Sequence, residues 1–310
     1  MDLFSIILII FGLVLFEIII SVDNAIINAE VLSTMSKKAR KWFLLWGILI
    51  AVFLVRGLLP WIIVWVSSPS LGFLGSFTAS FSSDPEVAKV IEESAPILLI
   101  GGGIFLVFLF FHWLFLEQKH YGLKGEEFIH KNGVWFFAVV SVLLSVIVWE
   151  AIKIRPWMAF GAVIGSTAFF ITHGFKENAE QMEKQMLEGS AEMSDISKIF
   201  YLEVIDATFS IDGILGAFAF TFILPLILIG NGIGALVVRQ LTVSNIERVK
   251  RYKYLKNGAM YSIFALGAVM ILHSFGVHIP EWISPVLTFG IIGYFFWKSV
   301  REIKSNSKAA

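Results

Sequence analysis

Two apolar stretches of the sequence carry acidic side chains at matching positions, at a constant offset of 189 residues. Each stretch reads acid, serine and aspartate in the same order, and the equivalent pairs are Glu17 with Asp206, Ser21 with Ser210 and Asp23 with Asp212. A carboxylate near the centre of a bilayer costs about 2.5–3.5 kcal/mol on insertion scales. Because this cost occurs twice in one pattern, the pattern predicts a functional site that needs negative charge.

The chemistry open to such a site is the binding of a hard cation. The oxygen donors are the carboxylates of Glu17, Asp23, Glu203, Asp206 and Asp212, the amides of Asn24 and Asn28, and the hydroxyls of Ser21 and Ser210. Against these five acids stand two intramembrane arginines, Arg56 and Arg239, so full ionisation leaves a charge of −3. Such donors suit Mg²⁺, Ca²⁺ or Mn²⁺.

Helical geometry leaves the conformation at the two aspartates open. At about 100° per residue, Glu17, Ser21 and Asn24 share one stripe, and Asp23 falls about 120° away from it. Asp212 is displaced from its own stripe by the same angle. Either the backbone unwinds at each aspartate and frees carbonyl ligands, or each aspartate faces a different neighbouring helix.

A structural role is the main alternative for these residues. The two leading acids could pair with Arg56 and Arg239 to hold helices together, and the two serines could bond to the backbone of their own helices. Two arginines cannot neutralise five acids, although protonation could cover some of the remainder. We therefore expect a cation site, with which helix pairing can coexist.

The composition predicts an all-α, polytopic membrane protein. The chain of 310 residues is 57% hydrophobic and 15% charged, with a mean hydropathy of +0.81, whereas soluble domains carry about 25% charged residues. The absence of cysteine excludes disulfides and zinc–thiolate sites. The net charge of zero argues against a broadly basic nucleic-acid-binding protein. The first apolar run carries the acidic motif, so we expect it to stay in the mature protein.

Membrane-length apolar runs predict nine transmembrane helices. They cover residues 3–31, 43–66, 96–116, 133–149, 157–173, 199–222, 226–246, 258–275 and 282–297, with a turn near Pro225. With the N-terminus outside, the inside segments hold 19 of the 24 Lys and Arg residues and the outside segments hold three. This distribution predicts a multi-pass protein of the cell membrane with an outside N-terminus and a cytoplasmic C-terminus.

The two acidic motifs fall on the first and sixth predicted spans, which cross the membrane in opposite directions. This arrangement predicts an inverted-topology repeat within a single transmembrane domain, with residues 1–150 and 151–310 as the two halves, each with extra helices. The following spans agree, because each carries an arginine nine residues after a glycine: Gly47 precedes Arg56 and Gly230 precedes Arg239.

Three further features are interpreted as structural. The run Gly101–Gly103 predicts close helix packing rather than a phosphate loop, because it lacks the Lys-Ser/Thr ending. His112 and His173 lie in predicted spans and are expected to pack between helices or at an interface rather than to bind metal. Segment 174–198, with alternating Lys and Glu from Lys176 onward, predicts a solvated, acidic helix on the inside.

At the acidic motifs the chain resembles the TerC-like family of integral membrane proteins. The first hallmark of that family, Glu followed by Ser-x-Asp-Asn, appears as Glu17, Ser21, Asp23 and Asn24. The second spans Glu203–Gly213, and its Asp-Gly ending is similar to one branch of the family. The likeness extends at least to the seventh predicted span. The resemblance implies export of Mn²⁺ and links to Ca²⁺ handling, whereas the residues alone reach only a hard divalent cation.

Together these observations lead us to expect a secondary transporter rather than an enzyme, driven by an ion gradient or the membrane potential. The expected metal ligands are Glu17, Asp23, Asn24, Glu203, Asp206 and Asp212, supported by Ser21, Asn28, Ser210, Arg56 and Arg239. We expect no cofactor, Mn²⁺ or Ca²⁺ as the transported ion, and the bilayer, not nucleic acid, as the other partner. The oligomeric state stays open.

Three other functions stay open at this point. A Ca²⁺/cation antiporter would use the same residues. A non-transporting membrane partner for the metalation of exported proteins would need the fold but not the flux. An intramembrane aspartyl hydrolase is disfavoured, because the usual Gly-x-Gly-Asp element is not found at Asp23 or Asp212.

Overall fold

The protein is an all-α bundle in this computed structural model, which describes residues 2–47, 50, 56–79, 85–187, 194–244 and 251–309. No strand occurs within these ranges. The α-helices are α1 (Leu3–Ile20), α2 (Val22–Ser33), α3 (Lys37–Trp42), α4 (Arg56–Ser67), α5 (Gly72–Ala79), α6 (Pro85–Leu116), α7 (Glu126–Lys131), α8 (Phe136–Ile154), α9 (Pro156–Leu187), α10 (Asp195–Ala217), α11 (Leu224–Ser244), α13 (Leu255–Ser274) and α14 (Ile283–Ala309). Shorter turns are the π-helical η1 (Phe43–Gly47) and the 3-10 turns η3 (Pro69–Leu71) and η4 (Gly133–Trp135).

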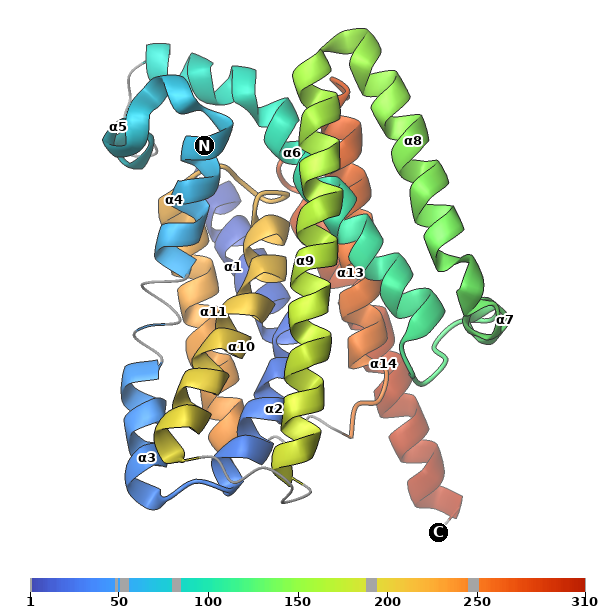
Figure 1. The fold of residues 1–310 in the computed structure, drawn as a ribbon. Helices are drawn as coiled ribbons and strands as arrows, with labels where there is room; N and C mark the ends of the chain where they lie inside the picture. The colour runs from blue at the N-terminus through green and yellow to red at the C-terminus, as the bar shows by residue number, and fades with distance from the viewer. Residues whose placement is uncertain are drawn as a thin grey trace.

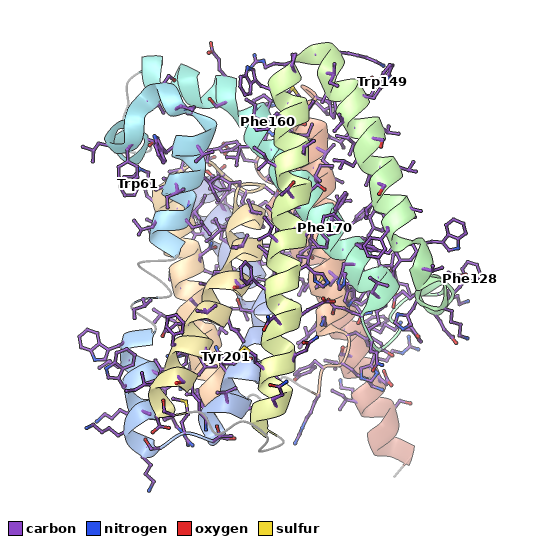
Figure 2. All side chains as sticks on the ribbon, in the orientation of Figure 1. Trp61, Phe128, Trp149, Phe160, Phe170 and Tyr201 are labelled. Atoms are coloured by element: carbon purple, nitrogen blue, oxygen red, sulfur yellow. The ribbon has the colours of Figure 1, made fainter. Side chains whose placement is uncertain are left out.

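Six described helices are long and apolar enough to cross a membrane. They cover Leu3–Ile20, Glu93–Phe115, Gly133–Ile154, Pro156–Asn178, Leu255–Ser274 and Ile283–Ser305. A seventh crossing is added if the pair Gly57–Val66 and Pro69–Ser76, bent by 103°, counts as one span. Large aromatic side chains such as Trp149 and Phe160 project from the outside of the bundle (Figure 2). An apolar exterior of this kind fits a lipid environment.

The predicted number of nine spans is neither confirmed nor contradicted. α10 carries several charged side chains, including Asp206 and Asp212, so it is less apolar than the six. The apolar part of α11, Leu224–Gln240, is shorter than any of the six candidate spans. The predicted span 43–66 includes residues outside the described ranges. The predicted turn near Pro225 is confirmed, because α10 ends at Ala217 and α11 begins at Leu224.

Two helices extend beyond their predicted ends. α6 begins at Pro85, so the outside loop predicted for 67–95 is largely helical where it is described, with η3 and α5 preceding α6. α9 continues to Leu187, so the start of segment 174–198 belongs to the same helix as the fifth predicted span. This second extension places Lys176 in the bundle rather than on a solvated helix.

Glycines bring the central helices α6, α9 and α13 into close contact. The Cα of Gly101 faces the carbonyl of Gly161 in α9, and Gly103 faces the carbonyl of Gly267 in α13. A Cβ at either α6 glycine would lie 2.9 Å from the facing oxygen, too close for any side chain. The predicted packing role of Gly101–Gly103 is therefore confirmed, as expected for helices that associate through small residues.

A buried carboxylate fixes the short helix α7 to α13. Glu126, only 2% exposed, accepts hydrogen bonds from the backbone amides of Gly122 and Leu123 at 2.7 and 3.0 Å. Asn257 and Tyr261 of α13 donate to the same carboxylate at 3.2 and 3.0 Å. Four donors thus saturate one buried anion, which holds the 117–132 connection against the bundle.

The two motif-bearing segments run in opposite directions through the bundle (Figure 1). The first has one irregular residue, Ser21, between α1 and α2. The helical hydrogen bonds continue across it, from the Ser21 amide to the Glu17 carbonyl at 3.1 Å and from the Ala25 amide to the Ser21 carbonyl at 2.9 Å. The second is the uninterrupted helix α10, which passes through Asp212. The unwinding that was one of the two expected conformations is therefore not found at Asp212, and the irregularity near Asp23 is limited to Ser21.

Candidate cation site

Glu17 lies at the meeting point of α1, α10 and α11, with 1% of its surface exposed. Its Oε1 accepts a hydrogen bond from Ser21 at 2.9 Å. If Gly213 carried a Cβ, that atom would lie 2.7 Å from Oε2 of Glu17. A Cβ at Gly234 would lie 2.6 Å from the Cβ of Glu17. Two glycines on neighbouring helices therefore make the space that this carboxylate occupies.

Asp212 forms a buried ion pair with Lys176 of α9. The distance from Lys176 Nζ to Asp212 Oδ2 is 2.5 Å, and the two side chains are 12% and 5% exposed. The other oxygen, Oδ1, has no hydrogen-bond partner among the described residues. Glu17 lies within electrostatic range of Asp212, so carboxylates from both motif copies share one region.

A polar group on α6, α9 and α13 extends this region toward the end of α6. Glu117 forms an ion pair with Lys256, with 2.7 Å between Oε2 and Nζ, and its Oε1 lies 3.6 Å from His112 Nδ1. The rings of His112 and His173 lie with their centroids 3.8 Å apart and are tilted by 53°, which confirms that the two histidines pack between helices. Burial alone raises the pKa of Glu117, but Lys256 and His112 outweigh it and hold the pKa below its usual range.

A second charged cluster surrounds Arg239 of α11. Asp206 and Glu203 of α10 are its electrostatic partners. The guanidinium also donates to the carbonyl of Phe43 and lies 4.2 Å from the centre of that ring. Gly47, at the end of η1, leaves the space for Glu203 Oε1, which has no hydrogen-bond partner among the described residues. The second motif therefore lies within electrostatic range of Arg239, in line with the structural alternative for Asp206.

The structure describes the side chains of only some of the other residues predicted for the site. Ser210 donates to the backbone carbonyl of Asp206 at 2.6 Å, so it bonds to its own helix. Asn28 is 5% exposed, and its Oδ1 has no hydrogen-bond partner within the described part of the chain. The side chains of Asp23, Asn24 and Arg56 lie outside the described residues.

The structure thus divides the predicted ligands between two clusters. One contains Glu17 and Asp212 with Lys176, and the other contains Glu203 and Asp206 with Arg239. Among the described side chains, no group of three or more acids or histidines is placed to hold a metal ion. Each cluster has two carboxylates and one cationic side chain, so full ionisation leaves a charge of −1 in each.

Sequence reasoning missed two residues of this region. The sequence places Lys176 on a solvated helix because the fifth predicted span ends at residue 173. One more turn of that span would include Lys176 among the residues of the bundle. Asn231 of α11 is 1% exposed, and neither amide atom has a hydrogen-bond partner among the described residues. It lies three residues before Gly234, which contacts Glu17, but a lone Asn in an apolar run carries no distinctive signal.

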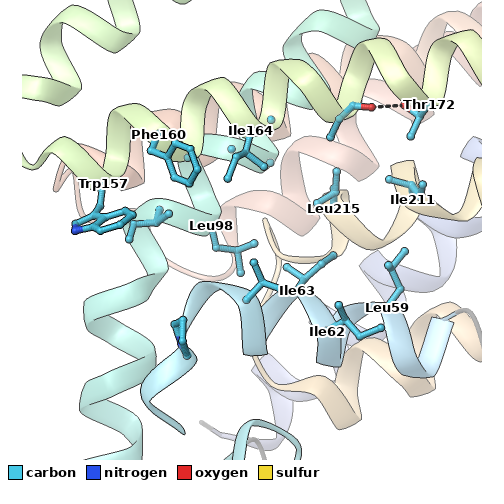
Figure 3. A pocket seen from close by; sticks show the side chains of 18 residues that line it. Leu59, Ile62, Ile63, Leu98, Trp157, Phe160, Ile164, Thr172, Ile211 and Leu215 are labelled. Atoms are coloured by element: carbon cyan, nitrogen blue, oxygen red, sulfur yellow. Dashed lines mark hydrogen bonds between the residues drawn. The ribbon is translucent and has the colours of Figure 1, made fainter. Parts of the chain in front are cut away.

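A cavity beside α10 is lined almost entirely by apolar side chains. It has a volume of about 600 Å³ and lies between α4, α6, α9 and α10, lined by side chains such as Leu59, Ile164 and Leu215 (Figure 3). The Thr172 hydroxyl at its rim donates to the carbonyl of Ala168 at 2.9 Å. A cavity with this lining offers no ligands to a cation, so we exclude it from the cation site.

Comparison with known proteins identifies a family. The model of a family described as a protein of unknown function (DUF475) matches residues 22–306, a range that starts after Ser21 and includes both Asp23 and Asp212. No curated protein and no solved structure matches the chain at a significant level. Because the family model covers most of its length, this membrane-type helical chain belongs to the DUF475 family.

Proposed function

We propose that this protein is a secondary transporter that exports a hard divalent cation, foremost Mn²⁺, across the cell membrane. In this proposal the N-terminus lies outside and the C-terminus lies in the cytoplasm. The two acidic motifs belong to two inverted halves that meet at the ion site. The alternating exposure of that site to the two sides would move the ion.

One observation carries the proposal: Glu17 of the first motif lies against Gly213 of the second, beside Asp212. Two buried carboxylates from segments that run in opposite directions therefore lie within electrostatic range of each other in an apolar bundle. Burying like charges together is unfavourable unless a cation compensates them. Hard oxygen ligands such as carboxylates are what alkaline-earth ions and Mn²⁺ favour.

The two clusters suggest separate roles in transport. Glu17 and Asp212 would form the ion site, with Asp23 and Asn24, which follow the irregular residue Ser21, as further ligands. Asp206 and Glu203, compensated by Arg239, would form a second station on the same helix. The orphaned oxygens of Asp212 and Glu203 are the positions where an ion finds lone pairs that no protein donor uses.

The choice of Mn²⁺ among hard divalent cations rests on the resemblance of both motifs to the TerC-like family. The donor set alone accommodates Ca²⁺ and Mg²⁺ equally, since all three ions bind carboxylate and amide oxygens. Competition among the three ions is therefore part of the test.

The direct test is Mn²⁺ flux in proteoliposomes that contain the full-length protein. We expect the wild-type protein to transport Mn²⁺. In Glu17→Gln the Mn²⁺ flux should fall about 10- to 100-fold, the range that loss of one supporting group costs at metal sites. Glu127→Gln is the matched control, because Glu127 is an exposed carboxylate paired with Lys131 at 2.7 Å on α7. Size-exclusion profiles establish that each variant is folded.

Three results would redirect the proposal. Unchanged flux in Glu17→Gln and Asp212→Asn contradicts the assignment of the site. Stronger inhibition of Mn²⁺ flux by Ca²⁺ than by Mg²⁺, with Ca²⁺ itself transported faster, identifies a Ca²⁺/cation antiporter. Absence of both flux and ion binding in the wild type favours a non-transporting partner in metalation.

A further inference from the structure

Lys176 is an unusual neighbour for a cation site, because it supplies a positive charge to one of the carboxylates. Its ammonium lies 2.5 Å from Asp212 Oδ2, and both side chains are almost fully buried. It belongs to α9, whereas Asp212 belongs to α10, so the pair joins two helices of the bundle. A divalent ion and an ammonium cannot occupy the same side of one carboxylate oxygen, since their charges repel at short range.

We propose that Lys176 is a tethered cation that occupies Asp212 in the ion-free protein and must be displaced when a divalent ion binds. The inference rests on the proposed transport function and deepens it, since it names the residue that competes with the substrate. Lys176 is then a specificity-determining residue, which sets how tightly the site holds an ion and returns to Asp212 after release.

The incomplete hydrogen bonding of Asp212 supports an exchangeable pair. A buried ion pair is stabilising only if further hydrogen bonds satisfy the remaining lone pairs. Oδ1 of Asp212 has no partner among the described residues, and it is buried. Glu126, in contrast, binds four donors in the same protein. Asp212 is therefore compensated in charge but keeps an oxygen open to an incoming ion.

The surroundings of Lys176 offer the displaced ammonium another place. Glu117 lies within electrostatic range of Asp212, and His173, three residues before Lys176, interacts with both Lys176 and Glu117. A lysine has a flexible four-carbon stem, so its charge can move several ångströms without movement of the helix. The polar group at the end of α6 can therefore receive the ammonium while it leaves Asp212.

The charge balance gives the exchange a direction. Glu17, Asp212 and Lys176 together carry −1, so an added divalent ion would bring the group to +1 unless the ammonium leaves. If the Lys176 ammonium moves away, the two carboxylates and one divalent ion together carry no net charge. A divalent ion at Asp212 therefore competes electrostatically with Lys176 for the same carboxylate.

The test measures Mn²⁺ affinity of the full-length protein in detergent by calorimetry, with two variants of opposite expected sign. Lys176→Gln removes the competitor and is expected to raise affinity about tenfold or more. Lys176→Arg is expected to lower affinity about tenfold, because a guanidinium binds both carboxylate oxygens at once and stays charged. Lys153→Gln, which breaks an exposed pair with Glu150 at 2.6 Å, is the control and should leave affinity unchanged.

The two variants separate competition from a merely structural pair. Unchanged or weaker binding in a folded Lys176→Gln protein overturns the inference. If this variant does not fold, Lys176→Arg decides, since unchanged or tighter binding there contradicts competition. A wild-type protein that binds no Mn²⁺, Ca²⁺ or Mg²⁺ defeats the proposed function itself, whereas wild-type binding that neither variant shifts defeats only the role of Lys176.

Discussion

Glu126 and Asp212 are both buried carboxylates, with 2% and 4% of their surfaces exposed, yet their surroundings differ in kind. Glu126 receives four hydrogen bonds from backbone and side-chain donors and fixes a connection to α13. Asp212 accepts a side-chain hydrogen bond from Lys176, and its other oxygen has no hydrogen-bond partner among the described residues. Burial is the same in the two regions, but only one of them has unused capacity to bind a cation.

The contrast separates structure from function more sharply than burial or charge alone. A saturated anion gains nothing from a further ligand, whereas an unsaturated one is costly until a ligand arrives. Asp212 also lies beside Glu17, so its region is short of positive charge. In our proposal the ion binds in the Asp212 region, whereas the Glu126 cluster holds the fold.

The largest effect is expected on stability when Glu126 is truncated. Glu126→Ala leaves several buried donors unpaired at about 1–3 kcal/mol each, so the free energy of unfolding should fall by several kcal/mol. Thermal unfolding in detergent, followed by the fluorescence of the ten Trp residues, measures the loss. The double variant Lys176→Met/Asp212→Asn removes both charges together and should change stability by less than about 1 kcal/mol while abolishing ion binding. Equal losses of stability in the two proteins would erase the comparison.

An intermediate effect is expected when the space for Glu17 is filled. A Cβ at Gly213 would lie 2.7 Å from Glu17 Oε2, so Gly213→Ala must displace the carboxylate, which as the end of a flexible side chain can move at little cost to stability. Mn²⁺ flux should fall because the carboxylate is displaced. Gly290→Ala is the matched control, because nothing lies within 4 Å of a Cβ there, and helix propensity predicts a gain of about 0.5–1 kcal/mol. Normal flux in Gly213→Ala would show that the position of Glu17 is not critical.

The smallest effect concerns pH and Glu117, at the outer edge of the Asp212 region. Its folded pKa lies below the ordinary value of 4.5, held there by Lys256 and His112 against the cost of burial. Its contribution to stability is therefore complete above pH 4.5 and is lost as the pH falls toward the folded pKa. Because the side chain is 29% exposed, we expect less than about 1 kcal/mol. Melting temperatures between pH 7 and pH 4 should show a shallower decline in Glu117→Gln than in the wild type.

Much of the fold could be predicted because apolar periodicity and length are local properties. The chain forms helices where the sequence predicts spans in the described ranges, and α11 begins beside Pro225 as expected. The end of α9 was misplaced because hydropathy falls after His173 while the helix continues to Leu187. Hydropathy reports the transfer of side chains into lipid, whereas a helix continues as long as its backbone hydrogen bonds are satisfied.

The candidate site was predicted only in part. The paired motifs placed Glu17, Asp206 and Asp212 inside the bundle, and all three are buried. The motifs did not predict that the acids separate into two clusters, because that division depends on which helices pack against α10. Nor did the matching sequences predict the local difference between the two copies, an irregular residue at Ser21 in one and a regular helix in the other.

By itself, the sequence determined the helical, membrane-type class of the protein, most of its helices and the residues that carry charge into the bundle. Composition and spacing are enough for this, because the cost of burying polar groups in lipid acts on each segment separately. Only the tertiary structure decided the partners: Lys176 at Asp212, Arg239 at Asp206, and glycines around Glu17. Partner choice depends on contacts between helices distant in the chain, and electrostatic interactions at a few ångströms are settled only when those helices have packed.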